Sequence, residues 1–179
     1  MRKVALFFSI FLFSTQIFAQ NQAIIGLDYL SGFYNDENED ITTVPATRLS
    51  FAYTYNEHKG VELHYVQGLS RRPHGQTGED VDINHVLSIF NTAKMSITDI
   101  SVLKSFYIGI GIAKGNITIY SQQNSDNHDI TSLSMLFGYR FEVFSNFALN
   151  LDYTIYTGRP FSSTDDGIES LAFGIRYQM

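Results

Sequence analysis

The last nine residues of the chain, LAFGIRYQM, alternate strictly between bulky side chains and small or polar ones. Leu171, Phe173, Ile175, Tyr177 and Met179 form the bulky set. Because successive side chains of a β-strand point to opposite faces, a period of two predicts a strand with two different faces. The same alternation recurs in seven further stretches: 22–33, 48–56, 60–70, 81–96, 105–115, 131–143 and 147–157. The sequence therefore predicts an all-β fold.

The two faces of these strands decide between two architectures. A soluble barrel or sandwich buries its apolar face, whereas a membrane barrel turns that face toward lipid. The apolar face here carries roughly thirty large side chains, more than the interior of a closed eight-stranded barrel can hold. The opposite face contains Gly109, Gly111, Gly138 and Gly174, which suit a narrow interior. The sequence predicts an eight-stranded antiparallel up-and-down transmembrane β-barrel with its bulky face outward.

The inward face also carries charged and titratable residues. We expect seven of them inside the barrel: Asp28, Glu62, His64, Arg140, Glu142, Asp152 and Arg176. One interpretation is a conduction pathway or a proton relay. The other is a plug of paired charges, since buried charges must be paired and hydrogen-bonded. The narrow interior of eight strands, compared with the open channel of wider porins, favours the plug.

The amino terminus has the pattern of a targeting segment. Arg2 and Lys3 precede a short apolar run, and Ala19 supplies a small residue at the expected cleavage point. This order is typical of a secretory signal peptide, and the run is short for a membrane anchor. We therefore expect residues 1–19 to be a cleaved signal peptide and residues 20–179 to form one barrel domain, exported to the outer membrane.

The composition of the mature chain excludes several classes of function. Of the 12 basic residues two lie in the signal segment, so 10 basic and 18 acidic residues leave a formal charge of −8. This balance argues against binding of nucleic acid, whose phosphates require a basic surface. Cysteine is absent, so neither a disulfide nor a thiolate metal site is expected.

Long and short connections alternate between the predicted strands. The short ones lie at 56–60, near 97–101 and at 144–146, and the long polar ones at 34–47, 70–80, 120–129 and 157–167. Outer-membrane barrels have short periplasmic turns and longer external loops. We therefore expect both termini on the periplasmic side and the four long loops outside, where an extracellular ligand could bind.

The whole mature chain resembles the small eight-stranded outer-membrane barrels of the OmpA/OmpX type. The resemblance rests on the strand pattern, on the glycine-rich YIGIGIAKG and on the final LAFGIRYQM. In that family the outer-membrane assembly machinery recognises the last strand. The resemblance implies an assembly signal in this chain at Phe173, Ile175, Tyr177 and Met179, with methionine standing where the family usually has an aromatic residue.

Some barrels of this size modify lipid A, so a hydrolase or acyltransferase is the alternative function. His85 and Ser88 are the most tempting pair for catalysis, but residues three apart on a strand project to opposite faces.

The acidic NDENED of residues 35–40 could hold Ca²⁺ but lacks the spacing of an EF-hand, and a solvated loop is favoured. Arg71 and Arg72 could contact lipopolysaccharide phosphates. We expect no enzyme, no cofactor and no metal, and a structural or surface-interaction role through the external loops without an open channel. The expected partners are membrane lipid, lipopolysaccharide and the assembly machinery.

The fifth strand contains one apparent change of parity. Its apolar residues are even-numbered up to Ile112, whereas Ile117 and Ile119 are odd. A one-residue slip moves every side chain to the other face. The sequence therefore predicts a β-bulge within AKGN, with Gly115 taking a positive φ, and strands five and six that extend beyond the membrane.

Overall fold

The computed structural model of the chain describes residues 22–35, 41–74, 79–95, 105–121, 124–157 and 167–179. These residues form strands joined by short connections, and every strand pairing is antiparallel. The strands are β1 (Gln22–Asn35), β2 (Ile41–Thr54), β3 (Lys59–Gly68), β4 (Arg72–His74), β5 (Glu79–Lys94), β6 (Phe106–Tyr120), β7 (Ser125–Phe144), β8 (Phe147–Thr157) and β9 (Gly167–Gln178). No helix long and apolar enough to cross a bilayer occurs among the described residues.

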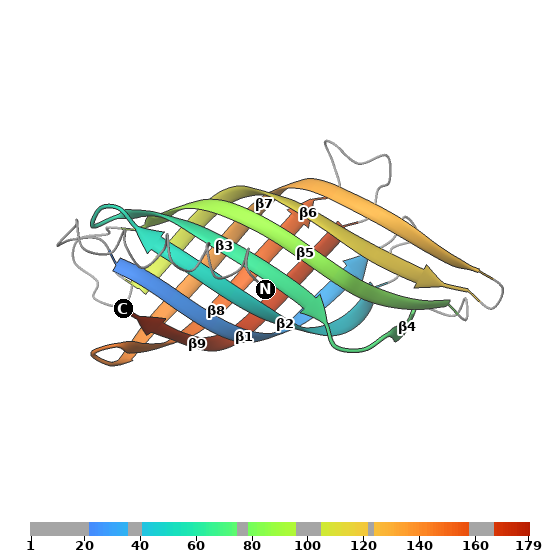
Figure 1. Cartoon of the computed structure of the whole chain (residues 1–179), viewed down its shortest axis with the longest axis horizontal. Helices are drawn as coiled ribbons and strands as arrows, with labels where there is room; N and C mark the ends of the chain where they lie inside the picture. The colour runs from blue at the N-terminus through green and yellow to red at the C-terminus, as the bar shows by residue number, and fades with distance from the viewer. Residues whose placement is uncertain (1–21, 36–40, 75–78, 96–104, 122–123, 158–166) are drawn as a thin grey trace, which may run out of the picture.

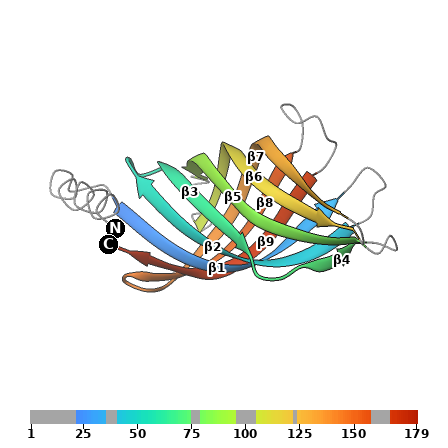
Figure 2. The ribbon, with the colours of Figure 1, turned by 45° about the vertical axis from the view of Figure 1, so that its right-hand side comes forward.

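The strands close into a barrel, as Figures 1 and 2 show. β1 pairs with β2 on one side and with β9 on the other, from Ile24 opposite Gln178 to Asn35 opposite Gly167. β3 and the short β4 pair one after the other with β5, so together they form one interrupted barrel strand. The structure thus confirms an eight-stranded antiparallel barrel closed by the last strand.

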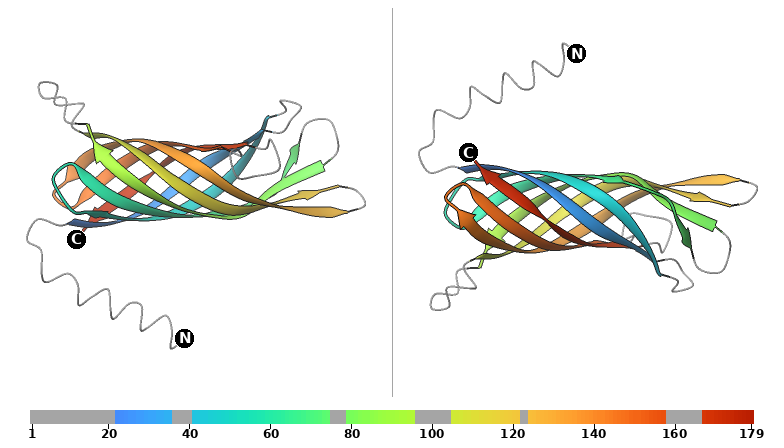
Figure 3. Two further views of the ribbon diagram at one scale, coloured as in Figure 1. Left: turned by 90° about the horizontal axis from the view of Figure 1, so that it is seen from above. Right: turned by 90° about the horizontal axis from the view of Figure 1, so that it is seen from below.

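The two ends of the barrel differ in construction. The terminal end, as we call it, carries Met179 and the tight turns at 55–58 and 145–146 (Figure 1). At the turn 55–58 the side-chain oxygen of Asn56 accepts hydrogen bonds from the backbone amides of His58 and Lys59, at 2.9 and 2.7 Å. The opposite, distal end carries β4 and the tip of the β6–β7 hairpin, which projects beyond the neighbouring strands (Figure 3). The predicted extension of strands five and six is therefore present.

The outer face of the barrel is apolar. Leu27 and Ile110, for example, are 58% and 66% exposed, whereas their strand neighbours Asp28 and Gly109 point inward and are buried. A band of exposed bulky side chains recurs on every long strand. The bulky face is therefore the lipid-facing one, as the alternation predicts.

The boundaries of several strands differ from the prediction. β2 begins at Ile41, so most of the loop expected at 34–47 is strand, paired with β1. This part of β2 contains Pro45, a residue that usually interrupts a sheet. Its carbonyl accepts a hydrogen bond from the Leu69 amide at 2.9 Å, just past the last β2–β3 pair, Ala46 and Gly68. An N–H at residue 45 would point to the same neighbouring strand, so the proline stands where the regular β2–β3 ladder ends.

Two of the other expected loops are shorter than predicted, since β6 and β7 occupy all but the middle of 120–129 and β4 lies within 70–80. The loop expected at 157–167 agrees with the end of β8 at Thr157 and the start of β9 at Gly167, which lies ahead of the predicted strand start at Leu171. The signal peptide at 1–19 lies outside the described residues, as do 36–40, 75–78, 96–104, 122–123 and 158–166.

The predicted bulge in AKGN is wrong. β6 pairs with β7 without interruption through Gly115, and the shift lies in the partner strand β5, between Ile83 and His85. Ile117 is fully buried because β6 keeps its alternation and this isoleucine points into the barrel. The prediction failed because it assigned every large apolar side chain of the strand to the lipid face.

A hydrophobic cluster fills the interior toward the distal end. Most of its members lie on the distal side of the charged residues, such as Leu30 beyond Asp28 in β1 and Val66 beyond His64 in β3. Phe90 and Tyr107 instead lie beside the charged residues, against His64 and Asp152 respectively. The cluster also includes Val44, Val81, Ile83, Val86, Phe90, Ile117, Ile130 and Ile168. The interior therefore has a polar zone nearer the terminal end and an apolar zone beyond it.

We predict that deleting residues 171–179 prevents assembly. The deletion removes the partners of Ile24 to Ser31 in β1 and of Phe147 to Tyr153 in β8, and unpaired backbone groups cost several kcal/mol each in lipid. The truncated chain should be degraded or aggregate, and should lack the heat-modifiable gel band of a folded barrel. Replacing Met179 with Phe should leave that band unchanged. A folded, membrane-inserted truncated chain would contradict this closure.

Candidate functional site: the charged interior of the barrel

Two arginines and two aspartates form the centre of the polar zone. Arg48 Nε donates to Asp28 Oδ2 at 2.7 Å, and its Nη2 donates to Asp152 Oδ2. Arg176 reaches the same two carboxylates, with Nη1 at 2.5 Å from Asp28 Oδ1 and Nη2 at 3.2 Å from Asp152 Oδ2. The four side chains come from β1, β2, β8 and β9 and are buried. Each charge is therefore shared between two opposite charges.

Glu62 and His64, both on β3, extend this centre toward the terminal end. Glu62 Oε1 lies 2.9 Å from His64 Nε2 and 3.7 Å from Arg176 Nη2. Glu62 Oε2 lies 3.9 Å from Arg140 Nη2. His64 Nδ1 lies 3.4 Å from Arg48 Nη1, so a neutral ring that accepts there and donates to Glu62 satisfies both contacts.

The charges of this cluster balance. The carboxylates of Asp28, Glu62 and Asp152 face the guanidinium groups of Arg48, Arg140 and Arg176, so the cluster is neutral with a neutral His64. Removing such charges from water costs several kcal/mol per ion, which good pairing offsets. The arrangement is that of a plug of paired charges.

Glycines make room for the cluster. A Cβ at Gly26 would overlap the Arg176 guanidinium, and one at Gly174 would overlap the Asp28 carboxylate. At Gly138 it would overlap both Asp152 and the ring of Tyr107, whose hydroxyl lies within hydrogen-bonding distance of Asp152 Oδ1 and, at 3.0 Å, of Asn150 Oδ1. Each of these glycines lies directly opposite the bulky residue on a neighbouring strand, so the large inward side chain occupies space that a side chain at the glycine position would need.

The seven residues expected inside the barrel occupy three environments. Asp28, Glu62, His64, Asp152 and Arg176 are buried in the cluster. Arg140 is half-buried where the cluster meets the terminal end, and Glu142 is exposed at the rim there. The exposed position of Glu142 differs from expectation because β7 continues past the enclosed part of the barrel.

Sequence reasoning missed Arg48, which is fully buried at the centre of the cluster. It stands at the first position of the predicted strand 48–56, directly after the expected loop 34–47, and it was not counted among the inward charges. The even positions around it still carry a signal, because Val44, Ala46, Ser50 and Ala52 share the inward face with Arg48. An arginine among small residues of one parity indicates an interior position.

The cluster does not suit a metal ion. Glu62, His64 and Asp152 offer ligand atoms that lie within 4.8 Å of one another. However, three guanidinium groups already balance the three carboxylates, so a divalent cation would leave excess positive charge in a buried site.

The geometry also disfavours nucleophilic catalysis. His85 is exposed on the outer face and Ser88 is buried inside, which confirms that this pair cannot meet. Ser88 instead lies opposite His64 across β3 and β5. Both ring nitrogens of His64 are occupied by Glu62 and Arg48, so the imidazole is not available as a base for the serine.

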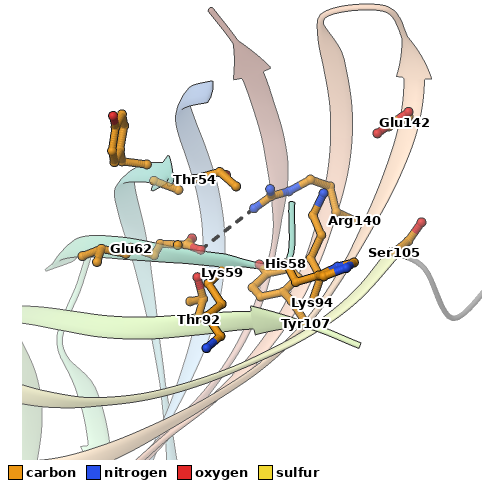
Figure 4. Close-up of a pocket in the computed structure, with 14 residues that line it drawn as sticks. Thr54, His58, Lys59, Glu62, Thr92, Lys94, Ser105, Tyr107, Arg140 and Glu142 are labelled. Carbon is orange, nitrogen blue, oxygen red and sulfur yellow. Dashed lines mark ion pairs between the residues drawn. The ribbon is translucent and has the colours of Figure 1, made fainter. Parts of the chain in front are cut away.

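The polar zone ends in a small pocket at the terminal end, shown in Figure 4. The pocket has a volume of about 60 Å³. Its charged and aromatic lining residues are Tyr53, His58, Lys59, Glu62, Lys94, Tyr107, Arg140 and Glu142. The Arg140 guanidinium carbon lies 5.0 Å from the centre of the Tyr107 ring. The polar zone is therefore open to solvent from this end.

The proposed assembly residues lie on the outer face of the last strand. Phe173, Ile175, Tyr177 and Met179 are all exposed. The Met179 amide donates to the Ala23 carbonyl at 2.9 Å, so the chain remains hydrogen-bonded to β1 up to its last residue.

Comparison with known proteins identifies solved structures that share this architecture. No protein family and no curated protein sequence match the chain. Among solved structures, Ail of Yersinia pestis, solved with the heparin analogue sucrose octasulfate, matches with a TM-score of 0.62 and 16% identity over 89% of this chain and 99% of Ail. Neisserial surface protein A matches with a TM-score of 0.65 and 12% identity over 88% and 97% of the two chains. The N-terminal β-barrel domain of Pseudomonas aeruginosa OprF matches with a TM-score of 0.61 and 14% identity over 89% and 100%.

These likenesses concern the fold. The chain has the fold of the small eight-stranded outer-membrane barrels, which confirms the resemblance to the OmpA/OmpX type at the level of architecture.

We predict that Arg48→Met strongly destabilises the barrel. The methionine leaves Asp28 and Asp152 with one guanidinium between them, and removing one partner of a buried pair costs about 3–5 kcal/mol. Urea unfolding in lipid vesicles, followed by circular dichroism, measures the free energy of unfolding. Lys114→Met, on the outer face, is the matched control and should change it by less than about 0.5 kcal/mol. Equal stability of Arg48→Met and wild type would show that the pairing contributes nothing.

Proposed function

We propose that the mature chain is a closed outer-membrane barrel with a structural or surface-interaction role carried by its distal end. In this proposal residues 1–19 direct export and are cleaved, the terminal end faces the periplasm and the distal end faces outward. The observation that carries the proposal is that the interior is filled along its length. The cluster of paired charges, whose net charge is zero, fills one part, and the apolar cluster fills the part beyond it. With the lumen filled, the ends of the barrel are the surfaces available for function.

The apolar cluster separates the charged cluster from the distal end. Leu30, Val44, Ile83 and Ile117 are each 2% exposed or less. A conducting path needs water or polar groups without a break along its length, and these packed apolar side chains interrupt such a path. This supports a barrel without an open channel.

The charge of the distal end bears on the kind of partner. Its described strand ends carry six acidic residues, Glu79, Asp80, Asp82, Asp126, Asp129 and Glu169. Arg71 and Arg72 are the basic residues there, and the Arg71 guanidinium lies over the Tyr120 ring at 3.6 Å. A surface of this sign attracts cationic partners and repels polyanions. A heparin-like ligand, as bound by Ail, is therefore not the partner proposed for this chain.

We predict that the purified barrel produces no steady conductance in planar lipid bilayers. The tightly packed interior near Phe90 and Ile117 leaves no aqueous path between the two compartments. The measurement is single-channel current after insertion, with a wide porin as positive control. Reproducible ohmic steps from the folded barrel would overturn the closed-barrel part of the proposal.

We also predict that the barrel in neutral nanodiscs binds cationic polypeptide and not heparin. Binding of polylysine should weaken as salt rises, because screening reduces interactions between exposed charges. A variant with Glu79→Gln, Asp80→Asn, Asp126→Asn and Asp129→Asn should bind less, whereas Glu57→Gln, at the terminal end, is the matched control and should not. Heparin binding at physiological salt, or polylysine binding indifferent to the four substitutions, would contradict the charge argument.

A further inference from the structure

We propose that the pocket at the terminal end binds a small oxyanion, a phosphate or carboxylate group, between Lys94 and Arg140. This site lies at the end of the barrel opposite the proposed interaction surface and is independent of it. Figure 4 shows the side chains of both residues in the pocket, from β5 and β7 respectively.

The charge of the pocket lining favours an anion. Lys59, Lys94 and Arg140 contribute positive charge, and His58 adds a fourth group that can carry it. Of the two carboxylates in the lining, Glu62 is held by His64 at 2.9 Å and by Arg176 at 3.7 Å. Glu142, at the exposed rim, is the other carboxylate of the lining, and it and Glu57 both act on Lys94, so the cationic groups still outnumber the carboxylates left to face them.

Arg140 has a hydrogen-bond donor that is not in use. Its ion pair with Glu62 is long, at 3.9 Å, and its Nε is buried without a hydrogen-bond partner. A buried donor without a partner costs free energy that a bound acceptor would recover. The planar guanidinium presents donors in a fork that matches two oxygens of a carboxylate or phosphate. The contact with the Tyr107 ring helps to hold the guanidinium in place.

Lys94 supplies the second cation. It lies at the last position of β5, and in Figure 4 its amino group points toward the side chain of Arg140. Two positive charges that converge in a partly desolvated pocket repel one another. An anion bound between them replaces this repulsion with two attractive interactions. The pocket volume of about 60 Å³ exceeds the space that one water needs, so a small oxyanion fits. Two sources share this chemistry: free phosphate, and the terminal carboxylate of a peptide.

The test is an NMR titration of the folded barrel in nanodiscs, observing the Nε–Hε signal of Arg140. Inorganic phosphate is one probe. The other is acetyl-alanyl-alanine as its free acid, with its amide as the uncharged counterpart. We expect a saturable shift of the Arg140 signal with phosphate, with the peptide acid or with both, and none with the amide. The probe that saturates identifies the source, and saturation by neither overturns the proposal.

Variants show whether the binding belongs to this pocket. Arg140→Gln and Lys94→Gln should each weaken binding about tenfold, since each removes one charge-assisted hydrogen bond. Binding to the variants is followed by anion-dependent thermal stabilisation, a readout that does not need the Arg140 signal. Lys114→Gln, on the outer face, is the control and should bind as the wild type does. Lys94 is exposed at the end of β5, so Lys94→Gln is expected to fold, and unchanged binding in this variant would overturn the proposal.

Discussion

Closure of the backbone hydrogen-bond ladder is the constraint on which the rest of this structure depends. A strand in lipid cannot leave its N–H and C=O groups unpaired, and the pairing of β1 with β9 removes the last free edge. Closure with eight strands fixes a narrow lumen. Every inward side chain must then fit that lumen, which explains the glycines at 26, 138 and 174 beside bulky charged groups.

The narrow lumen in turn dictates the electrostatics of the interior. Arg48 and Arg176 are almost completely buried, so each guanidinium needs carboxylates at hydrogen-bonding distance. Asp28 and Asp152 supply them from the two strands β1 and β8, and Glu62 links the centre to Arg140. The apolar cluster needs no such compensation and seals the distal half. The exposed pocket at Arg140 and Lys94 is where the pairing is least complete.

The alternation of side chains was enough to predict the barrel, its lipid face, its glycine-lined interior and its closing strand. The prediction from alternation failed where the residue types of a strand were those usually found in a loop. The stretch of β2 before Arg48 contains threonines and Pro45, and the reason proline is tolerated there, the end of the β2–β3 ladder at Ala46, is a property of the neighbouring strand. The bulge was misplaced for a similar reason, since Ile117 faces an apolar zone inside the barrel that no single strand reveals.

The partners in the charged cluster could not be predicted either. Arg48 and Asp152 are 104 residues apart, and their contact depends on the register of every strand between them. A list of inward charges therefore indicates a plug without showing which charges meet.

The central claim is that the bulky face points to lipid and the charged face points inward. The chain contains no tryptophan, so a single one can be introduced at a chosen position. Ile89 and Phe90 are neighbours at similar depth on β5, with 45% and 0% of their surface exposed. In vesicles containing brominated lipids, Ile89→Trp should be strongly quenched and Phe90→Trp should be protected. Quenching of Phe90→Trp with protection of Ile89→Trp would show that the faces are inverted and would contradict this account.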